Sequence, residues 1–376
     1  MFMDVSSELV HSLLPVFMTS VLGASMVTIG FIEGIAEATA AITKIFSGAL
    51  SDYLGKRKLL VVLGYGLGAI TKPVFPLATS ITWVLAARFI DRLGKGIRGA
   101  PRDALVADIT PPHLRGAAYG LRQALDSVGA CVGPLLAVIF MALLSGDIKS
   151  VLWIATLPAF ISVALLVIIV REPEGTVLNS HQRTVFTVRN AERLGRRYWL
   201  IVVLGAIFTL ARFSEAFLVL IAQHTGLAVS FVPIVMIVMN VVYAAAAYPL
   251  GTASDKFGWR TLLLCGLAVL IVSDVVLVYA ASIGMVLVGA ALWGLHMAIT
   301  QGLFSKLVAD TAPADLRGTA FGVFNLVTGG SVLLANVIAG ELWSALGPSA
   351  TFLAGAAFAT IAAIGLLTYR PRPFVS

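Results

Sequence analysis

Long apolar runs separated by short polar segments make up almost the whole chain. A helix needs about 20 mostly apolar residues to cross a membrane, and twelve runs approach or exceed that length. They lie near residues 2–23, 27–50, 58–78, 81–107, 117–143, 150–170, 199–223, 228–250, 261–281, 283–308, 318–343 and 350–369. The pattern therefore predicts twelve membrane-spanning helices. A polar, arginine-rich linker at 171–198 divides them into a six-helix bundle at 1–170 and another at 199–376.

The composition excludes a soluble protein. The chain is 59% hydrophobic and 12% charged, whereas soluble domains are about half apolar and about a quarter charged. We therefore expect an all-α polytopic membrane protein surrounded by the lipid bilayer. Its net charge of +7 could suggest nucleic acid, but cations in the loops between spans are what the positive-inside rule produces. No nucleic-acid partner is expected.

The loop charges also predict the orientation. Basic residues gather in the loops on one side of the predicted spans, and they include Lys56, Arg57, Lys58, Arg115, Lys256, Arg260, Arg317, Arg370 and Arg372. The opposite loops carry little beyond Asp147 and Lys149, so both termini are expected to face the cytoplasm. We expect no cleavable signal peptide. Because no basic leader precedes the first run, the start is expected to be trimmed relative to related chains.

Two motifs occur twice in the chain. GALSDYLGKR begins at Gly48 and GTASDKFGWR begins at Gly251, which is 203 residues later. VADITPPHLRG begins at Val106 and VADTAPADLRG begins at Val308, which is 202 residues later. Repeats separated by about half the chain predict two homologous helical bundles with a central cavity between them.

The first motif permits a tight turn between two helices, because it has glycines at both ends. It resembles the loop between helices 2 and 3 of the major facilitator superfamily of transporters. The resemblance implies two pseudo-symmetric six-helix bundles, transport by alternating access, an inner-membrane location and a monomer. It also implies a cytoplasmic gate, whose residues would be Gly48, Asp52, Gly55, Arg57, Arg115 and Asp255.

The fourth predicted span is unusually rich in charge. Its cations are spaced by three and four residues, so they form a stripe on one face of a helix. The stripe consists of Arg88, Arg92, Lys95, Arg98 and Arg102. Each intramembrane charge is costly unless it faces water or a partner, so the stripe is expected to face a cavity or other charged helices. Its role is either a structural salt-bridge network or the handling of substrate and protons.

The arginines of this span carry a further resemblance. Arg88 or Arg92, followed by Gly94 and Gly96, is similar to the helix-4 arginine motif of the superfamily. That motif implies a role for the arginine in proton transfer, and either arginine could be the equivalent residue.

Charged residues in the neighbouring spans are candidates for transport chemistry. A carboxylate in a partly desolvated cavity can load and release a proton near neutral pH. The proton-coupling candidates are Asp4, Glu8, Glu33, Glu37 and Asp126. The substrate-binding candidates are His11, Arg88, Arg92, Arg122 and Arg212.

The first span also allows a different interpretation. Asp4, Glu8 and His11 share one helix face. Two carboxylates and an imidazole could bind a divalent cation, with Glu33 and Glu37 completing the site. The same atoms could form a proton relay, which the resemblance favours. A divalent-metal transporter of the same fold is therefore the alternative.

The fifth span contains Gly129, Gly133 and Pro134. Glycines four residues apart permit close helix approach, and a proline bends a helix. The segment resembles the helix-5 motif of antiporters in the superfamily, which implies proton-coupled antiport and hence export. An ordinary packing groove is the alternative.

No GxxxxGK(S/T) nucleotide-binding sequence occurs, so an ion gradient is expected to supply the energy. We predict no enzyme activity and no cofactor. The predicted function is that of a secondary transporter, a proton-coupled antiporter that exports a small anionic or amphipathic molecule. A non-transporting membrane sensor is a further alternative. The identity of the substrate and the direction of transport stay open.

Overall fold

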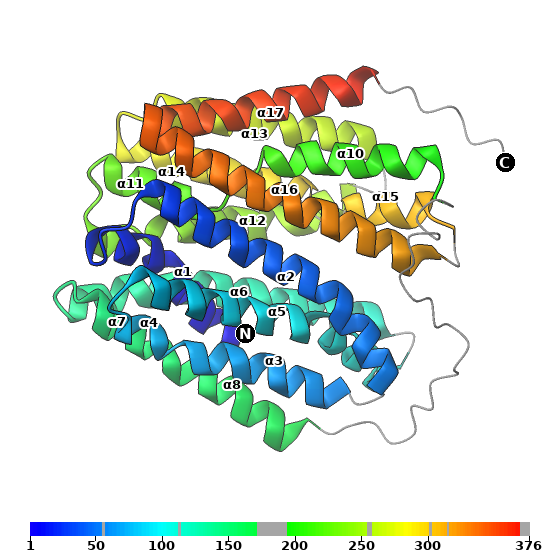
Figure 1. Ribbon diagram of the computed structural model, residues 1–376, viewed down its shortest axis with the longest axis horizontal. Coiled ribbons are helices and arrows are strands. Elements are labelled where there is room, and N and C mark those ends of the chain that lie inside the picture. The colour runs from blue at the N-terminus through cyan, green and yellow to red at the C-terminus, as the bar shows by residue number, and fades with distance from the viewer. Residues whose placement is uncertain are drawn as a thin grey trace.

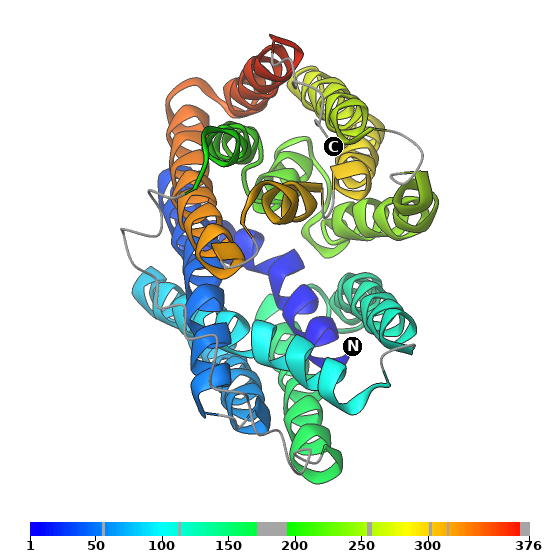
Figure 2. The same ribbon diagram turned by 90° about the vertical axis from the view of Figure 1, so that its right-hand side faces the viewer.

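The computed structural model describes residues 1–54, 57–111, 114–170, 194–253, 258–300, 303–313 and 316–368. The N-terminal half contains α1 (Phe2–Ser20), α2 (Met26–Leu54), α3 (Arg57–Thr71), α4 (Val74–Leu77), α5 (Ile81–Ile109), α6 (Arg115–Leu143), α7 (Ile148–Ile154) and α8 (Thr156–Ile169). The C-terminal half contains α10 (Arg196–Leu210), α11 (Ala216–His224), the short 3₁₀ helix η2 (Val229–Phe231), α12 (Ile234–Ala253), α13 (Trp259–Val278), α14 (Ile283–Thr300), α15 (Leu303–Thr311), α16 (Arg317–Leu346) and α17 (Pro348–Thr368). The two halves form two helical bundles that lie side by side (Figures 1 and 2).

The long helices run roughly parallel to one another, so the molecule has two ends (Figure 1). We call the end at which α8 finishes and α10 begins the linker end. The opposite end, where α1 connects to α2 and α6 connects to α7, is the hairpin end.

Each predicted span corresponds to one helix or to a pair of consecutive helices. The span near 58–78 is divided into α3 and α4 at Lys72 and Pro73, where a proline begins the second piece. The span near 199–223 is divided into α10 and α11. Helix α10 begins at Arg196, inside the segment predicted as the linker, and residues 171–193 lie outside the described part of the chain.

Within the described residues, nine helical segments are long and apolar enough to cross a membrane. The predicted spans that do not meet this criterion are α1, α5 and the pair α10 and α11. Charged side chains within α1 and α5 lower the hydropathy of these two spans, whereas α10 has 15 residues and α11 has 9, so neither is long enough by itself. The same three spans contribute most of the ionisable groups described below.

Equivalent helices pair in the same way within the two bundles. Helix α2 packs against α5 as α12 packs against α14, and α1 packs against α6 as α10 packs against α16. Glycines allow the backbones to approach closely. A Cβ atom on Gly94 of α5 would lie 2.6 Å from the carbonyl oxygen of Gly64 of α3, and one on Gly294 of α14 would lie 2.2 Å from that of Met239 of α12. The duplication seen in the sequence is thus present in the helix pairing.

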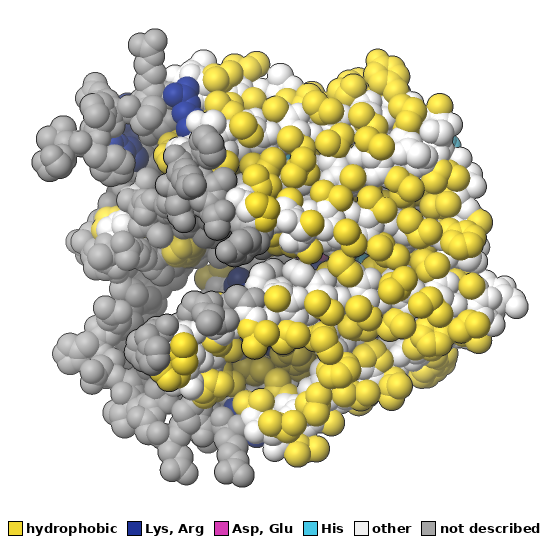
Figure 3. All heavy atoms as spheres, turned by 180° about the vertical axis from the view of Figure 1, so that it is seen from behind, with side chains coloured by type: hydrophobic (Ala, Val, Ile, Leu, Met, Phe, Trp, Pro, Cys, Tyr) yellow, Lys and Arg dark blue, Asp and Glu magenta, His cyan; other side chains and the backbone are white. Residues whose placement is uncertain are grey.

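The two bundles are in contact at the hairpin end. Helix α2 packs along α16, where a Cβ atom on Gly30 would lie 2.2 Å from the carbonyl oxygen of Asn336. The Gln223 amide at the end of α11 donates a hydrogen bond to the Ser20 hydroxyl at the end of α1, at 3.0 Å. The hairpin end is therefore closed. Toward the linker end, beside the residues drawn in grey, a hollow separates the two halves (Figure 3).

The outer surface between the two ends is apolar. Hydrophobic side chains cover most of the described surface seen in Figure 3. Large examples include Leu143, which is 70% exposed, and Ile168, which is 78% exposed. Such a surface is costly in water and matches the hydrocarbon core of a bilayer. It supports a multi-pass membrane protein.

Candidate functional site

A cavity of about 650 Å³ lies between the two bundles. Its N-terminal wall is mostly charged and is formed by Glu8, His11, Glu37, Arg92 and Lys95. Its C-terminal wall is mostly aromatic or hydroxyl-bearing, and includes Phe208, Thr209, Phe213, Tyr243, Thr300, Phe304, Phe324 and Thr328. The inter-bundle contacts at the hairpin end close the cavity on that side. The two walls belong to different bundles, so a molecule bound in the cavity would contact both.

The deepest charged group of the site is Glu33 on α2, whose side chain is fully buried. The Arg88 guanidinium of α5 donates two hydrogen bonds to it, from Nε to Oε1 at 3.2 Å and from Nη2 to Oε2 at 2.8 Å. A planar guanidinium paired with both carboxylate oxygens is the strongest form of ion pair. Because α2 and α5 pack together, the pair offsets two charges that neither helix could carry alone.

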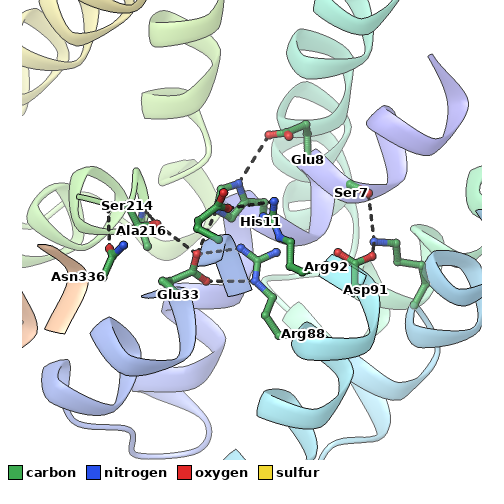
Figure 4. A network of polar contacts seen from close by, with 12 residues as sticks. Ser7, Glu8, His11, Glu33, Arg88, Asp91, Arg92, Ser214, Ala216 and Asn336 are labelled. Carbon is green, nitrogen blue, oxygen red and sulfur yellow. Dashed lines mark hydrogen bonds and ion pairs between the residues drawn. The ribbon is translucent and has the colours of Figure 1, made fainter. Parts of the chain in front are cut away.

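The His11 ring lies between two carboxylates (Figure 4). Its Nδ1 is 3.8 Å from Oε2 of Glu8, one turn earlier on α1, and its Nε2 is 3.7 Å from Oε2 of Glu33. Both distances exceed a hydrogen bond, so a water molecule or a small movement has to close each gap. Glu8 lines the cavity, whereas Glu33 lies deeper. The three side chains thus form a row from the cavity into the protein.

Two cations of the α5 stripe line the cavity. Arg92 pairs with Glu37 of α2, with 2.9 Å between Nη1 and Oε1. Lys95, one turn further along α5, is exposed in the cavity. Among the described residues, no carboxylate lies within 4.0 Å of its ammonium group. Lys95 therefore presents a positive charge to the cavity without a counter-ion from this part of the chain.

The other members of the stripe contact neighbouring helices instead of the cavity. Arg98 lies over the ring of Tyr65 of α3, with 4.4 Å between its Cζ and the ring centroid. Such a cation–π contact stabilises a desolvated guanidinium. Arg102 contacts two carboxylates: its Nε lies 3.5 Å from Oδ1 of Asp103 on the same helix, and its Nη2 lies 3.5 Å from Oδ2 of Asp126 of α6. The stripe predicted from the sequence is thus divided between the cavity and a network of charged helices.

Three of the candidate residues belong to that network and not to the cavity wall. Asp4 pairs with the amino group of Met1 at 2.9 Å. Arg122 pairs with Asp103, and Asp126 pairs with Arg102. All three lie closer to the linker end of the N-terminal bundle than Glu33 does, because they are on the linker-end halves of α1 and α6.

Lys72 is a buried cation that the sequence analysis did not single out. Its side chain is 1% exposed, and its ammonium group lies 2.8 Å from Oδ1 of Asp91 and 3.1 Å from the Ser7 hydroxyl. The pair joins the end of α3 to the middle of α5. A single lysine inside an otherwise apolar predicted span was the available signal, since such charges are functional or paired.

The C-terminal half contributes charge from the interruption between α10 and α11. Arg212 and Glu215 lie in this interruption, and both line the cavity. Ser214 lies between them and is 9% exposed. Its backbone N–H donates to Oδ1 of Asn336 of α16 at 2.7 Å, which satisfies a donor that a continuous helix would have bonded internally.

Gly129 and Gly133 of α6 face α1. A Cβ atom on Gly129 would lie 2.9 Å from the carbonyl oxygen of Met1, and one on Gly133 would lie 2.7 Å from that of Val5. The two glycines therefore set the close packing of α1 on α6, inside the N-terminal bundle. Pro134 lies within α6. Across the bundle boundary, α6 contacts α12, where the Asn240 amide donates to the carbonyl oxygen of Ala130 at 3.0 Å.

The gate motif at the linker end is described only in part. A Cβ atom on Gly48 of α2 would lie 3.5 Å from the Cβ of Ala100 of α5. Arg57 pairs with Asp108 of α5, with 2.9 Å between Nη1 and Oδ2. The Arg57 pair joins α3 to α5 in the same bundle. The remaining gate candidates lie outside the described residues or have side chains that do: Asp52, Gly55, Arg115 and Asp255.

The divalent-metal alternative gains no support from the geometry. Within the described residues, no group of three or more His, Cys, Asp or Glu side chains is arranged to hold a metal ion. Glu8 turns toward His11, whereas Asp4 pairs with the amino group of Met1.

Comparison with known proteins gives the family. The sequence profile described as Major Facilitator Superfamily matches residues 1–218 and again residues 201–376. An uncharacterised MFS-type transporter of Methanocaldococcus jannaschii is 34% identical over 372 residues, which are 97% of this chain and 91% of that protein. The multidrug resistance protein MdtH of Photorhabdus laumondii is 33% identical over 145 residues, which are 38% of this chain and 35% of that protein.

A solved structure shows the same fold. The crystal structure of a mutant of the nucleoside transporter NupG has a TM-score of 0.81 at 13% identity and covers 97% of this chain and 96% of that one. At this identity the similarity concerns the fold alone. Together with the profile that spans both halves, it shows that the chain is a multi-pass membrane transporter, not an enzyme, and that it belongs to the Major Facilitator Superfamily.

Proposed function

We propose that the protein is a proton-coupled antiporter that exports a small amphipathic anion through the central cavity by alternating access. It works as a monomer in the inner membrane, with both termini and the linker end facing the cytoplasm. In this orientation the structure is open to the cytoplasm and closed at the hairpin end. Similarity to a protein named for multidrug resistance supports export.

The row formed by Glu8, His11 and Glu33 carries the proposal. Glu8 is 25% exposed and lines the cavity, so it can exchange protons with water there. The His11 ring has one nitrogen toward each carboxylate, and an imidazole that accepts a proton on one nitrogen can release one from the other. A proton can therefore pass from Glu8 to Glu33 without crossing an apolar region. Intramembrane carboxylates and histidines of this kind form the proton relays of transporters.

The two walls of the cavity support the substrate class. Lys95 offers a cation that the described residues do not neutralise, as noted above. On the opposite wall three aromatic rings pack together. The ring centroid of Phe304 lies 5.0 Å from that of Phe208 and 5.8 Å from that of Phe324. A substrate with an anionic group that pairs with Lys95 and an apolar part that packs on these rings would contact both walls favourably. Arg88 and Arg92 do not add to the anion preference, because both already have carboxylate partners.

Uptake into proteoliposomes tests the coupling. Naphthalenesulfonate is a suitable probe because it is anionic at every pH and does not carry protons itself. An inside-acid gradient should drive its uptake, and a protonophore should abolish the effect. Glu8→Gln should remove this dependence on the gradient while leaving counterflow exchange of the probe. Glu341→Gln, on an exposed glutamate of α16, is the control. Uptake by the wild type that ignores the gradient would contradict proton coupling.

The same assay tests the substrate class. Lys95→Ala should raise the naphthalenesulfonate concentration needed for half-saturation by at least about tenfold, because one charge-assisted contact in a partly desolvated site contributes about 1.5–3 kcal/mol. Lys149→Ala, on an exposed lysine at the hairpin end, should change nothing. Equal uptake of a naphthyl quaternary ammonium compound, unaffected by Lys95→Ala, would reject the anion preference.

A further inference from the structure

The interruption between α10 and α11 contains side chains that line the cavity and, next to them, a hydroxyl that contacts Glu33 of the N-terminal bundle. Helix α10 ends at Leu210 and α11 begins at Ala216. Arg212 and Glu215 in the interruption line the cavity. Ser214 lies between them and also lines the cavity. Its hydroxyl points to the N-terminal bundle, where it donates a hydrogen bond to Oε2 of Glu33 at 3.1 Å (Figure 4). One short segment thus contacts both the cavity and the proposed proton site.

Ser214 is held firmly in this position. Its backbone N–H donates to Oδ1 of Asn336, and its hydroxyl oxygen accepts a hydrogen bond from the N–H of Ala216 at 3.2 Å. Its carbonyl oxygen accepts one from the N–H of Phe217 at 3.1 Å. The Asn336 side chain is fixed in turn, since its amide nitrogen donates to the carbonyl oxygen of Val332 at 2.8 Å. With these partners in place, the hydroxyl hydrogen is directed at Glu33.

The other groups around Glu33 all come from the N-terminal bundle. Arg88 of α5 pairs with it, and His11 of α1 lies 3.7 Å away. Arg92 of α5 and Glu37 of α2 lie further from Glu33, within electrostatic range. Within the described residues, Ser214 is the only residue of the C-terminal half that hydrogen-bonds to a carboxylate of the N-terminal half. The strength of this hydrogen bond between the two bundles therefore depends on the charge of Glu33.

We propose that Ser214 is a positioning residue that couples the proton site at Glu33 to Arg212, the cationic cavity-lining residue of segment 211–215. The inference rests on the proton-coupled transport proposed above. A hydrogen bond to a charged carboxylate is about twice as strong as one to a neutral acceptor. When a proton from the cavity reaches Glu33 through Glu8 and His11, it forms an O–H bond on the carboxylate. The bond from Ser214 then weakens and segment 211–215 is released.

The coupling has to work in both directions. A substrate that binds to Arg212 moves Ser214 and so changes how readily Glu33 takes up a proton, because coupling between two binding sites is reciprocal. Typical couplings change an affinity by about 5–150-fold. One charge-assisted hydrogen bond is sufficient to produce an effect at the lower end of that range.

Four forms of the protein test the proposal in the naphthalenesulfonate assay: the wild type, Ser214→Ala, Ser214→Thr and Ser273→Ala. Ser273 is the matched control, because it is a buried serine whose hydroxyl donates inside the C-terminal bundle, to the carbonyl oxygen of Gly289 at 2.8 Å. Ser214→Ala should reduce the stimulation by the proton gradient by about tenfold and leave counterflow exchange in place. Ser214→Thr keeps the hydroxyl and should keep the stimulation.

The pH profile separates a coupling role from a structural one. Ser214→Ala removes a donor that favours the charged carboxylate, so the midpoint of gradient-driven uptake should move to higher pH. Ser273→Ala should leave the midpoint unchanged. An unchanged midpoint and an unchanged gradient stimulation in Ser214→Ala would overturn the inference.

Hydrogen–deuterium exchange gives a readout that does not depend on transport. In purified protein, peptides covering 210–218 should exchange faster in both Ser214→Ala and Glu33→Gln, and the double variant should exchange no faster than the single ones. Additive effects would overturn the link to Glu33. If Glu33→Gln does not fold, faster exchange in Ser214→Ala but not in Ser214→Thr decides the same question. Absence of gradient-driven uptake in the wild type would instead reject the proposed function, and the exchange result would still decide the link.

Discussion

Three arginines of α5 are each stabilised by a specific neighbour. Arg88 meets Glu33, Arg92 meets Glu37, and Arg98 lies on an aromatic ring. Replacing a buried ion pair by apolar residues is often neutral or stabilising, whereas removal of one partner leaves an uncompensated charge. Stability and transport should therefore respond differently to changes at this pair.

Arg88→Met should destabilise the protein by about 3–5 kcal/mol, because it leaves Glu33 buried without its guanidinium. The double variant Arg88→Met with Glu33→Leu should recover most of the lost stability and still fail to couple uptake to protons. The midpoint of thermal unfolding in detergent measures the first effect, and the proteoliposome assay measures the second. A double variant no more stable than Arg88→Met would show that the pair is not the main source of the loss.

The sequence identified most of the charged residues of the site, because a charge within an apolar run is conspicuous. It could not assign their partners, since spacing along a helix gives the direction of a side chain but not the helix that it faces. Asp4 and Glu8 share a face of α1, yet Asp4 pairs with the amino group of Met1 and Glu8 lies beside His11. Lys72 was missed because a lone lysine near the end of a predicted span resembles an interfacial one.

At the scale of helices, the apolar runs gave the number and order of the spans but not their interruptions. Hydropathy averaged over about 20 residues is insensitive to a break of a few residues. The divisions at Lys72 and Pro73 and at 211–215 were therefore not predicted. The second division matters most, because it supplies Arg212, Ser214 and Glu215 to the site.

The close packing of α2 on α16 makes Gly30 a sensitive position. The Cβ atom of Gly30→Ala would lie 2.2 Å from the backbone oxygen of Asn336, so the helices have to separate. The population with a closed hairpin end should fall. Spin labels at Ser25→Cys and Ser344→Cys, in a variant without Cys131 and Cys265, should report a longer distance across the α2–α16 contact.

Gly66→Ala is the matched control for this change. No atom lies within 4 Å of a Cβ at Gly66 of α3, so the substitution meets open space. The same distance distribution in Gly30→Ala, Gly66→Ala and the unsubstituted protein would show that the glycine contact does not determine closure.

At the scale of the whole molecule, the two bundles meet at the hairpin end and separate around the cavity. Alternating access requires the hairpin-end contacts to break while the linker-end halves approach. The contacts that must break include the bond from Gln223 to Ser20, the Gly30 contact and, by our proposal, the bond from Ser214 to Glu33.

A reducible cross-link at the hairpin end should stop transport. Gln223→Cys and Ser20→Cys replace side chains whose polar atoms are 3.0 Å apart, so a short bis-methanethiosulfonate reagent can join them. Uptake of naphthalenesulfonate should be lost on cross-linking and should return after reduction, in a variant without Cys131 and Cys265. Full uptake by the cross-linked protein would mean that the hairpin end need not open.

The pairing of α5 with earlier helices bears on how the protein is made. Helix α5 contains Arg88, Arg92 and their neighbours in the stripe, and by itself it would enter a bilayer poorly, since each charge near the centre disfavours insertion by about 2.5–3.5 kcal/mol. The partners Glu33, Glu37 and Tyr65 all precede it in the chain, so they emerge from the ribosome first. With this order of synthesis, the charged side chains of α5 can pair with helices that have already reached the insertion machinery. A chain rearranged so that α5 came first would have no such partners during its insertion.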